Sequence, residues 1–116
     1  MTKRVLASLV LVLLITLPSF AHAILLEATP SANGSVAGPD IDVKLRFNSR
    51  IDSARSRLTL VRPDQTLLAV SIQPSSNAAL LDAHITGLGK GEYKLRWQVL
   101  AADGHITRGE IPFQVK

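Results

Sequence analysis

The residues best suited to chemistry in this chain are its three histidines, His22, His84 and His105. Asp103 lies two residues before His105, and in an extended segment two such side chains point to the same side of the backbone. A carboxylate and an imidazole in this arrangement can share one metal ion. Asp103-Gly104 is also a favoured hairpin-turn sequence, so the pair alone leaves a metal site and a plain turn both open.

His22 strengthens the metal interpretation because it stands at a possible cleavage site. If processing leaves His22 first, its free α-amine and its Nδ1 atom can chelate a metal. With a carboxylate oxygen of Asp103 and the imidazole of His105, the ligands are three nitrogens and one oxygen, which suits the tetragonal preference of Cu(II). Cu(I) prefers sulfur ligands, and the chain has no cysteine and a single methionine, the initiator.

The N-terminal residues have the order of a secretory signal peptide. Two basic residues precede an apolar run at 5–17, and a proline and small residues follow. The run is shorter than the about 20 apolar residues of a transmembrane helix, which disfavours an uncleaved anchor. Two cleavage sites compete, because a cut after Ala21 leaves His22 first and a cut after Ala23 leaves Ile24 first.

We expect residues 1–21 to be the signal peptide and residues 22–116 to form one exported domain in the periplasm. The whole chain has 13 basic and 9 acidic residues, and two of the basic residues lie in the signal peptide. The small remaining excess of positive charge, without aromatic residues between the arginines, does not favour nucleic acid as a partner. Without cysteine, the domain must be stabilised by packing or by a bound metal.

The exported part of the chain has the pattern of short β-strands. Apolar and polar residues alternate at 41–47, 93–99 and 111–115, as in half-buried strands. Four further strands are expected at 24–28, around Leu58 and Leu60, at 67–72 and at 79–85. Turn residues separate these segments at the spacing of a sandwich. We therefore predict an all-β fold, a seven-stranded antiparallel β-sandwich of immunoglobulin-like or Greek-key topology.

Two further expectations follow from this strand pattern. The aromatic residues Tyr93, Trp97 and Phe113 fall on the apolar side of the last two strands and should lie in the core. Pro112 has no backbone N–H, which indicates an edge or a bulge in the last strand. His84 has no partner nearby in sequence, so we interpret it as a structural or solvated histidine.

An ordered set of segments relates the exported chain to a known family. The segments are 22–34, 43–47, 91–97 and the Asp103-Gly104-His105 stretch before the final strand. Together they resemble the CopC family of periplasmic copper-binding proteins. The resemblance implies a seven-stranded sandwich and Cu(II) ligands at His22 (amine and imidazole), Asp103 and His105. It also implies a role in copper homeostasis or resistance, with a CopD-like inner-membrane protein as a partner. We expect a monomer.

The sequence departs from the family pattern at two places. The methionine-rich Cu(I) site of some relatives cannot form here. Where some relatives have a glutamate after the strand that ends at Phe47, this chain has Asn48-Ser49-Arg50, so an added carboxylate ligand is not expected there.

Three classes of function remain open from the residues. The first is a copper carrier or scavenger. The second is a metal-free sandwich domain for protein contacts, which is favoured if Ile24 becomes the first residue. The third is a copper oxidase, because an N-terminal histidine brace also occurs in oxidative copper enzymes. Asp103 would add an anionic ligand that stabilises Cu(II) against reduction, so we predict that the protein is not an enzyme.

Overall fold

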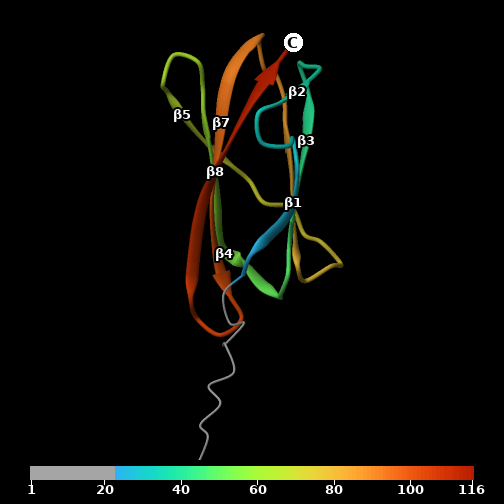
Figure 1. Cartoon of the computed structure of the whole chain (residues 1–116), viewed down its shortest axis with the longest axis vertical. Helices are drawn as coiled ribbons and strands as arrows, with labels where there is room; N and C mark the ends of the chain where they lie inside the picture. The colour runs from blue at the N-terminus through green and yellow to red at the C-terminus, as the bar shows by residue number, and fades with distance from the viewer. Residues whose placement is uncertain (1–22) are drawn as a thin grey trace, which may run out of the picture.

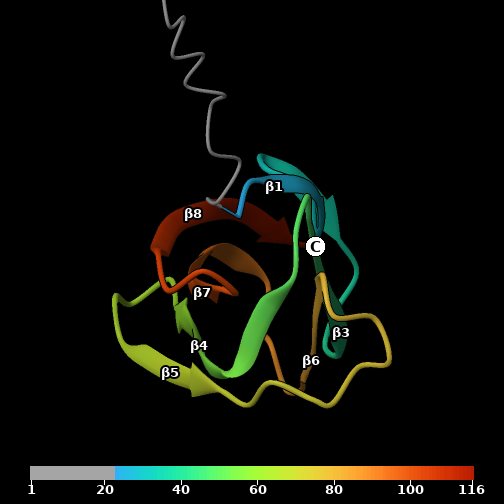
Figure 2. The ribbon, with the colours of Figure 1, turned by 90° about the horizontal axis from the view of Figure 1, so that it is seen from below.

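The chain from residue 23 to residue 116, the part that the computed structural model describes, forms two β-sheets packed face to face (Figure 1). The strands are β1 (Leu25–Thr29), β2 (Gly34–Val36), β3 (Ile41–Phe47), β4 (Ile51–Val61), β5 (Leu67–Val70), β6 (Leu80–Ile85), β7 (Gly91–Ala101) and β8 (Ile106–Val115). One sheet has the order β1-β3-β6 and the other the order β2-β8-β7-β4-β5. Figure 2 shows β3 and β6 facing the layer of β4, β7 and β8.

The predicted all-β sandwich is confirmed, with eight strands instead of seven. All seven expected segments contribute strands. The additional strand, β2, has only 3 residues and pairs with Phe113–Val115 of β8 in parallel, so the sandwich is not purely antiparallel. A strand this short has no alternation that could reveal it in the sequence. Within residues 23–116, no helix has the length and apolar character needed to span a membrane.

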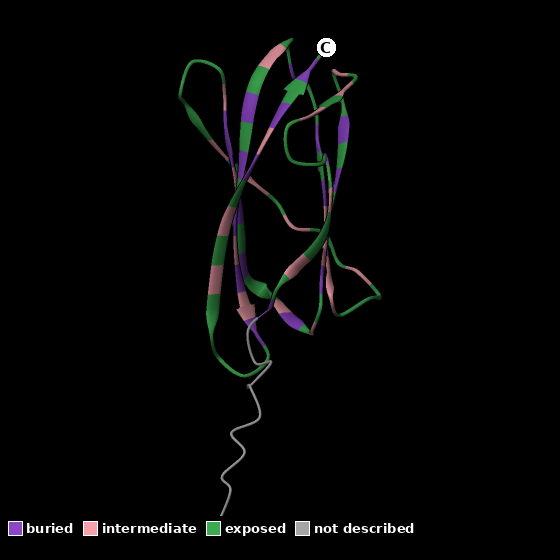
Figure 3. Cartoon of the chain, in the orientation of Figure 1, coloured by how far each residue is buried: buried purple, intermediate pink, exposed green. Residues whose placement is uncertain are grey.

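The three aromatic residues expected in the core are buried there. Phe47 meets the ring of Trp97 edge-on, with ring centroids 5.3 Å apart, and Tyr93 stacks on Phe113 at 5.6 Å. The hydroxyl of Tyr93 donates a hydrogen bond to the carbonyl of Gly89 at 2.8 Å, which satisfies its polar end. Figure 3 shows buried and more exposed residues alternating along β7 and β8. Each sheet therefore presents one apolar face to the other.

Pro112 lies where β8 changes its neighbours, in agreement with the edge predicted from the sequence. Ala101 N–H donates to the His105 carbonyl at 2.8 Å, so Ala101 and His105 are a hydrogen-bonded pair. Because such pairs alternate along an antiparallel ladder, odd-numbered residues of β8 bond to β7, and even-numbered residues direct their N–H and C=O away from it. The Pro112 carbonyl accordingly accepts from Asn33 N–H on the β2 side. Since the missing N–H of Pro112 is also on that side, the proline removes no bond to β7.

A bulge in β4 keeps that strand paired with β7 close to the β7–β8 turn. The register shifts between Asp52 and Arg57. The buried Ser56 hydroxyl donates to the Asp52 carbonyl at 2.7 Å and accepts from Leu100 N–H at 3.2 Å. The side chain thus replaces a ladder partner, and Ile51 beyond the bulge pairs with Ala101, the last residue of β7.

We predict that Gly109→Ala destabilises the fold. A Cβ at Gly109 would overlap the indole ring of Trp97, so the ring or β8 must move. Overpacking of this kind costs about 1–3 kcal/mol of unfolding free energy, measurable by urea denaturation. The control is Gly89→Ala, where nothing lies within 4 Å of an added Cβ and little change is expected. Equal stability of the two variants would contradict the packing described here.

Candidate metal centre

A tight turn between β7 and β8 carries both Asp103 and His105. Gly104 N–H donates to the Ala101 carbonyl at 2.9 Å, and Gly104 has a φ of 93°, in the region that favours glycine. Ala101 N–H closes the hairpin on the His105 carbonyl at 2.8 Å. The connection is therefore a three-residue turn with a glycine bulge, one residue longer than the two-residue turn suggested by Asp-Gly. The turn interpretation of this sequence and the metal interpretation are compatible.

The side chains of Asp103 and His105 contact each other in this turn. His105 Nδ1 lies 2.6 Å from Asp103 Oδ2, and His105 N–H donates to Asp103 Oδ1 at 3.2 Å. Partial burial raises the pKa of Asp103, but the hydrogen bonds from the ring and backbone of His105 outweigh it and hold that pKa below its usual value. An ionised carboxylate only accepts, so Nδ1 carries the proton in this contact. Nε2 is then the ring nitrogen directed away from Asp103.

A carboxylate that fixes one imidazole nitrogen is a common support for metal binding by the other nitrogen. The His105 side chain is 58% exposed and the Asp103 side chain 31% exposed, so solvent and ions reach both. Residues 23–116 contain no group of three or more acidic or histidine side chains that could hold a metal. Among the described residues, the candidate ligands at this end are therefore the pair Asp103 and His105.

The described chain begins at a well-anchored point. His22 lies outside the described residues, so its predicted role as a ligand is not tested. Its neighbour Ala23 is fully buried. Ile24 N–H donates to Asn48 Oδ1 at 2.8 Å, and the Ile24 carbonyl accepts from Asn48 N–H at 2.9 Å. The segment that leads into β1 is therefore fixed to the loop 48–50 between β3 and β4.

The same loop is attached to the turn that holds Asp103 and His105. Ala102 N–H donates to the Arg50 carbonyl at 3.2 Å, and the next residue after the loop, Ile51, pairs with Ala101. The start of β1 and the β7–β8 turn accordingly lie at the same end of the sandwich, the lower end in Figure 1. Loop 48–50 is thus the bridge between them.

Sequence reasoning missed the role of Asn48. It considered loop 48–50 only as a position without an added carboxylate ligand. The structure shows instead that the Asn48 side chain holds the backbone of Ile24. Asn side chains commonly bond nearby backbone in loops, and this general tendency was the available signal. The partner, 24 residues away in sequence, is set by the pairing of β1 with β3.

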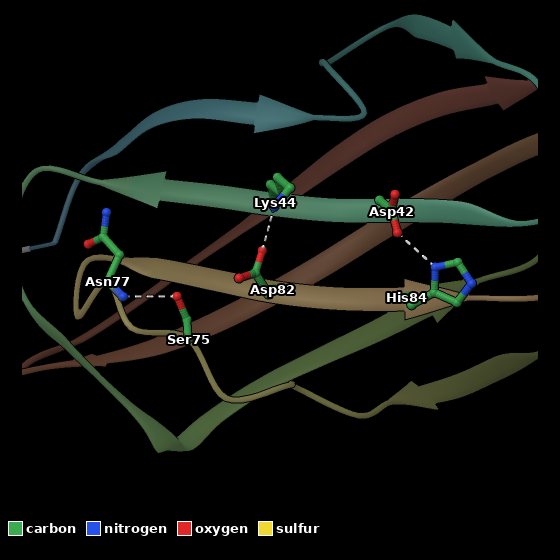
Figure 4. A network of polar contacts seen from close by, with 6 residues as sticks. All are labelled: Asp42, Lys44, Ser75, Asn77, Asp82 and His84. Atoms are coloured by element: carbon green, nitrogen blue, oxygen red, sulfur yellow. Dashed lines mark hydrogen bonds and ion pairs between the residues drawn. The ribbon is translucent and has the colours of Figure 1, made fainter.

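His84 is on the other sheet and is not brought to the Asp103–His105 pair. Its Nδ1 lies 2.8 Å from Asp42 Oδ1, beside a Lys44–Asp82 ion pair of 3.2 Å (Figure 4). Asp42 is directly opposite His84 in the β3–β6 register. The expected structural histidine thus has a partner that only strand pairing could reveal.

Comparison with known proteins shows which family has this architecture. Residues 25–116 match the CopC domain. The crystal structure of CopC from Methylosinus trichosporium OB3b is similar with a TM-score of 0.77 and 30% identity, covering 82% of this chain and 94% of that chain. The structure of PcoC, a methionine-rich copper resistance protein from Escherichia coli, is similar with a TM-score of 0.66 and 25% identity, covering 83% of this chain and 100% of that chain.

Copper transport protein CutJ of Bacillus subtilis is 27% identical over 116 residues and covers 92% of this chain. This chain spans only 21% of the length of CutJ. The CopC domain match includes all eight strands and the turn with Asp103 and His105. The resemblance recognised in the sequence is thereby confirmed, and the chain belongs to the CopC family.

Proposed function

We propose that this protein binds Cu(II) at the end of the sandwich where β1 begins and β7 turns into β8. It sequesters or carries the copper in homeostasis or resistance. The observation that supports this most is the double attachment of loop 48–50, to Ile24 and to Ala102. Residue 22 is bonded to Ala23, and consecutive Cα atoms are about 3.8 Å apart. If cleavage makes His22 the first residue, it is bonded directly to the anchored segment, which enters β1 at the end that carries Asp103 and His105.

The proposed ligands are the amine and Nδ1 of His22, a carboxylate oxygen of Asp103 and the imidazole of His105. In the described structure Asp103 Oδ2 contacts His105 Nδ1, and an ion held by Nε2 of the same ring lies beyond the reach of that carboxylate. Copper binding therefore requires Asp103 to leave Nδ1 and turn to the ion, which the exposure of both side chains allows. Three nitrogens and one oxygen suit Cu(II), which also binds more tightly than the other divalent first-row metals to such sites. The copper is cargo, and the chain supplies the donor atoms from exposed side chains at one end of the sandwich.

The cellular setting is part of the same proposal. A signal peptide at residues 1–21 exports the domain to the periplasm, where a CopD-like inner-membrane protein is its partner and the domain acts as a monomer. The descriptions of PcoC as a copper resistance protein and of CutJ as a copper transport protein support the copper role. The chain is proposed to hold copper without turning over a substrate, because the anionic Asp103 ligand favours Cu(II) over the reduced ion.

The first prediction is that signal-peptide cleavage occurs between Ala21 and His22. Only a free amine makes His22 a chelating residue, so the intact mass of the exported protein should correspond to a chain that begins at His22. A form that retains Ala21 should lose much of its Cu(II) affinity. A mature chain that begins at Ile24 would refute the site and favour a metal-free protein-contact domain.

The second prediction concerns the turn. His105→Ala and Asp103→Ala should each weaken Cu(II) binding by at least about 10-fold, the lower range for changes that merely disturb a ligand's support. Competition titration with a chelator of known affinity measures the effect. His84→Ala is the matched control, because it also removes an imidazole in contact with an aspartate. If a turn variant binds Cu(II) as tightly as the control, the substituted residue is not a copper ligand.

The third prediction is a fall in Cu(II) affinity as pH decreases. Copper must displace protons from the α-amine and the imidazole of His22, groups whose ordinary pKa values are about 7.7–8.0 and 6.5. Binding should weaken gradually from about pH 8 to 6 and steeply below about pH 5–6. Asp103 does not limit binding in this range, because His105 lowers its pKa.

Titrations with other metals complete this test. Zn(II) should bind more weakly than Cu(II), and a reductant should release the copper because no sulfur ligand is present. Equal affinities for Zn(II) and Cu(II), or affinity independent of pH, would exclude the proposed ligands.

A further inference from the structure

The first half of β8 is an unpaired sheet edge. β7 covers one side of β8 along its length, whereas β2 covers the other side only at Phe113–Val115. Within the described chain, no strand pairs with the outer side of residues 106–110, which we call the open edge. The residues of this edge that face the opposite sheet, Thr107 and Gly109, are only half-buried, as expected for a strand without a second neighbour.

The strand register identifies the backbone groups that this edge presents. Even-numbered residues of β8 direct their N–H and C=O away from β7, as the bond from Asn33 N–H to the Pro112 carbonyl demonstrates. The open edge therefore presents the N–H and C=O groups of Ile106, Arg108 and Glu110. It begins directly after the turn that carries His105.

The outer face of the sheet beside the open edge is basic. Arg57, Gln98 and Arg108 form a row across β4, β7 and β8. Arg108 Nε donates to Gln98 Oε1 at 2.8 Å. Arg57 has no acidic partner within residues 23–116. The row borders a shallow groove of about 490 Å³.

The groove also contains Arg96 and Glu110, which form an ion pair of 3.1 Å. Its three arginines thus face a single carboxylate, and Arg96 already neutralises that carboxylate. The remaining positive charge of Arg57 and Arg108 favours an anionic ligand. Guanidinium groups bind carboxylates in a bidentate and directional way.

We infer that the open edge docks an extended acidic segment of another protein as an additional strand. Backbone hydrogen bonds to Ile106, Arg108 and Glu110 would hold the segment, as in other cases of strand addition. Its carboxylates would face Arg108 and the positive groove. Docking itself does not depend on copper. The role that we give to docking rests on the proposed function. A docked strand would end beside the proposed copper ligands of the turn, so the partner could receive or deliver the ion.

A second copy of this chain fits the open edge less well. Pairing centred on Arg108 would place two arginines opposite each other, and like charges in that position are destabilising. The carboxylate that a second copy could offer, Glu110, is held by Arg96. The ladder would also stop at Pro112, where Asn33 takes the edge. A contact limited to residues 106–110 is short, and small interfaces are typical of transient encounters.

The test uses the copper-free purified protein and two soluble peptides of equal length. One alternates glutamate with threonine, and the other alternates lysine with threonine. In the free protein, the amides of Arg108 and Glu110 should exchange rapidly, whereas those of Thr107 and Gly109 are bonded to β7. The acidic peptide should slow exchange at Arg108 and Glu110 by about 10-fold or more. The basic peptide should bind at least about 10-fold more weakly.

Matched substitutions separate strand pairing from simple charge attraction. Glu110→Pro removes the N–H of residue 110, which belongs to the open edge. It removes no bond to β7, because the N–H of residue 110, like that missing at Pro112, points away from β7. This variant should abolish docking. Glu110→Gln makes a similar change in charge but keeps the N–H, and should bind the acidic peptide at least as well as the parent. Equal binding by the two variants would overturn the strand-addition proposal.

Arg108→Glu tests the charge requirement independently and does not rely on a proline. It should abolish the preference for the acidic peptide, because the introduced carboxylate offsets Arg57, and an unchanged preference would overturn the proposal. Protection of the Arg108 and Glu110 amides in the free protein, or their concentration-dependent protection through dimer formation, would also overturn it. Because no copper is present, these outcomes are independent of the metal titrations.

Discussion

The end of the sandwich that carries the proposed site depends on loop 48–50, which hydrogen-bonds two segments that are far apart in sequence. Asn48 holds the backbone of Ile24 through both its side chain and its main chain, and the Arg50 carbonyl holds Ala102. These are ordinary hydrogen bonds, each worth about 1 kcal/mol net. Their importance is geometric, because they fix the entrance to β1 relative to the β7–β8 turn. The sandwich supplies the rigid frame, and the loop joins the two parts of the proposed site.

Much of the fold was predictable because it depends on alternation. The pattern around Tyr93 and Trp97 gives one inward and one outward face whatever the neighbouring strand is. Two features were not predictable. β2 is too short for a pattern, and its pairing is specified by contacts with β8. The bulge in β4 depends on the Ser56 hydroxyl, and the sequence does not distinguish this buried serine from a solvated one.

The candidate site also combines features set by local sequence with features set by pairing between strands. Asp103 and His105 are close in sequence, and their spacing was enough to group them, but a turn at Gly104 brings them together and not the extended segment assumed from the sequence. Asn48 with Ile24, and His84 with Asp42, are contacts set by strand register. A shift of one residue in the β3–β6 register would place His84 against a different neighbour. Local patterns therefore identified chemical groups, whereas pairing between strands determined the partners.

The packing of Trp97 has an optical consequence. It is the sole tryptophan of the chain, and its indole lies between Phe47, the last residue before loop 48–50, and Gly109 on the open edge. Near-ultraviolet fluorescence of the protein therefore comes mainly from one position, which contacts the end of β3 and the open edge. Its wavelength and intensity respond to local polarity and to nearby quenching ions. The molecule thus contains an intrinsic fluorophore that reports on the open edge and on the strand end that precedes loop 48–50 without a label.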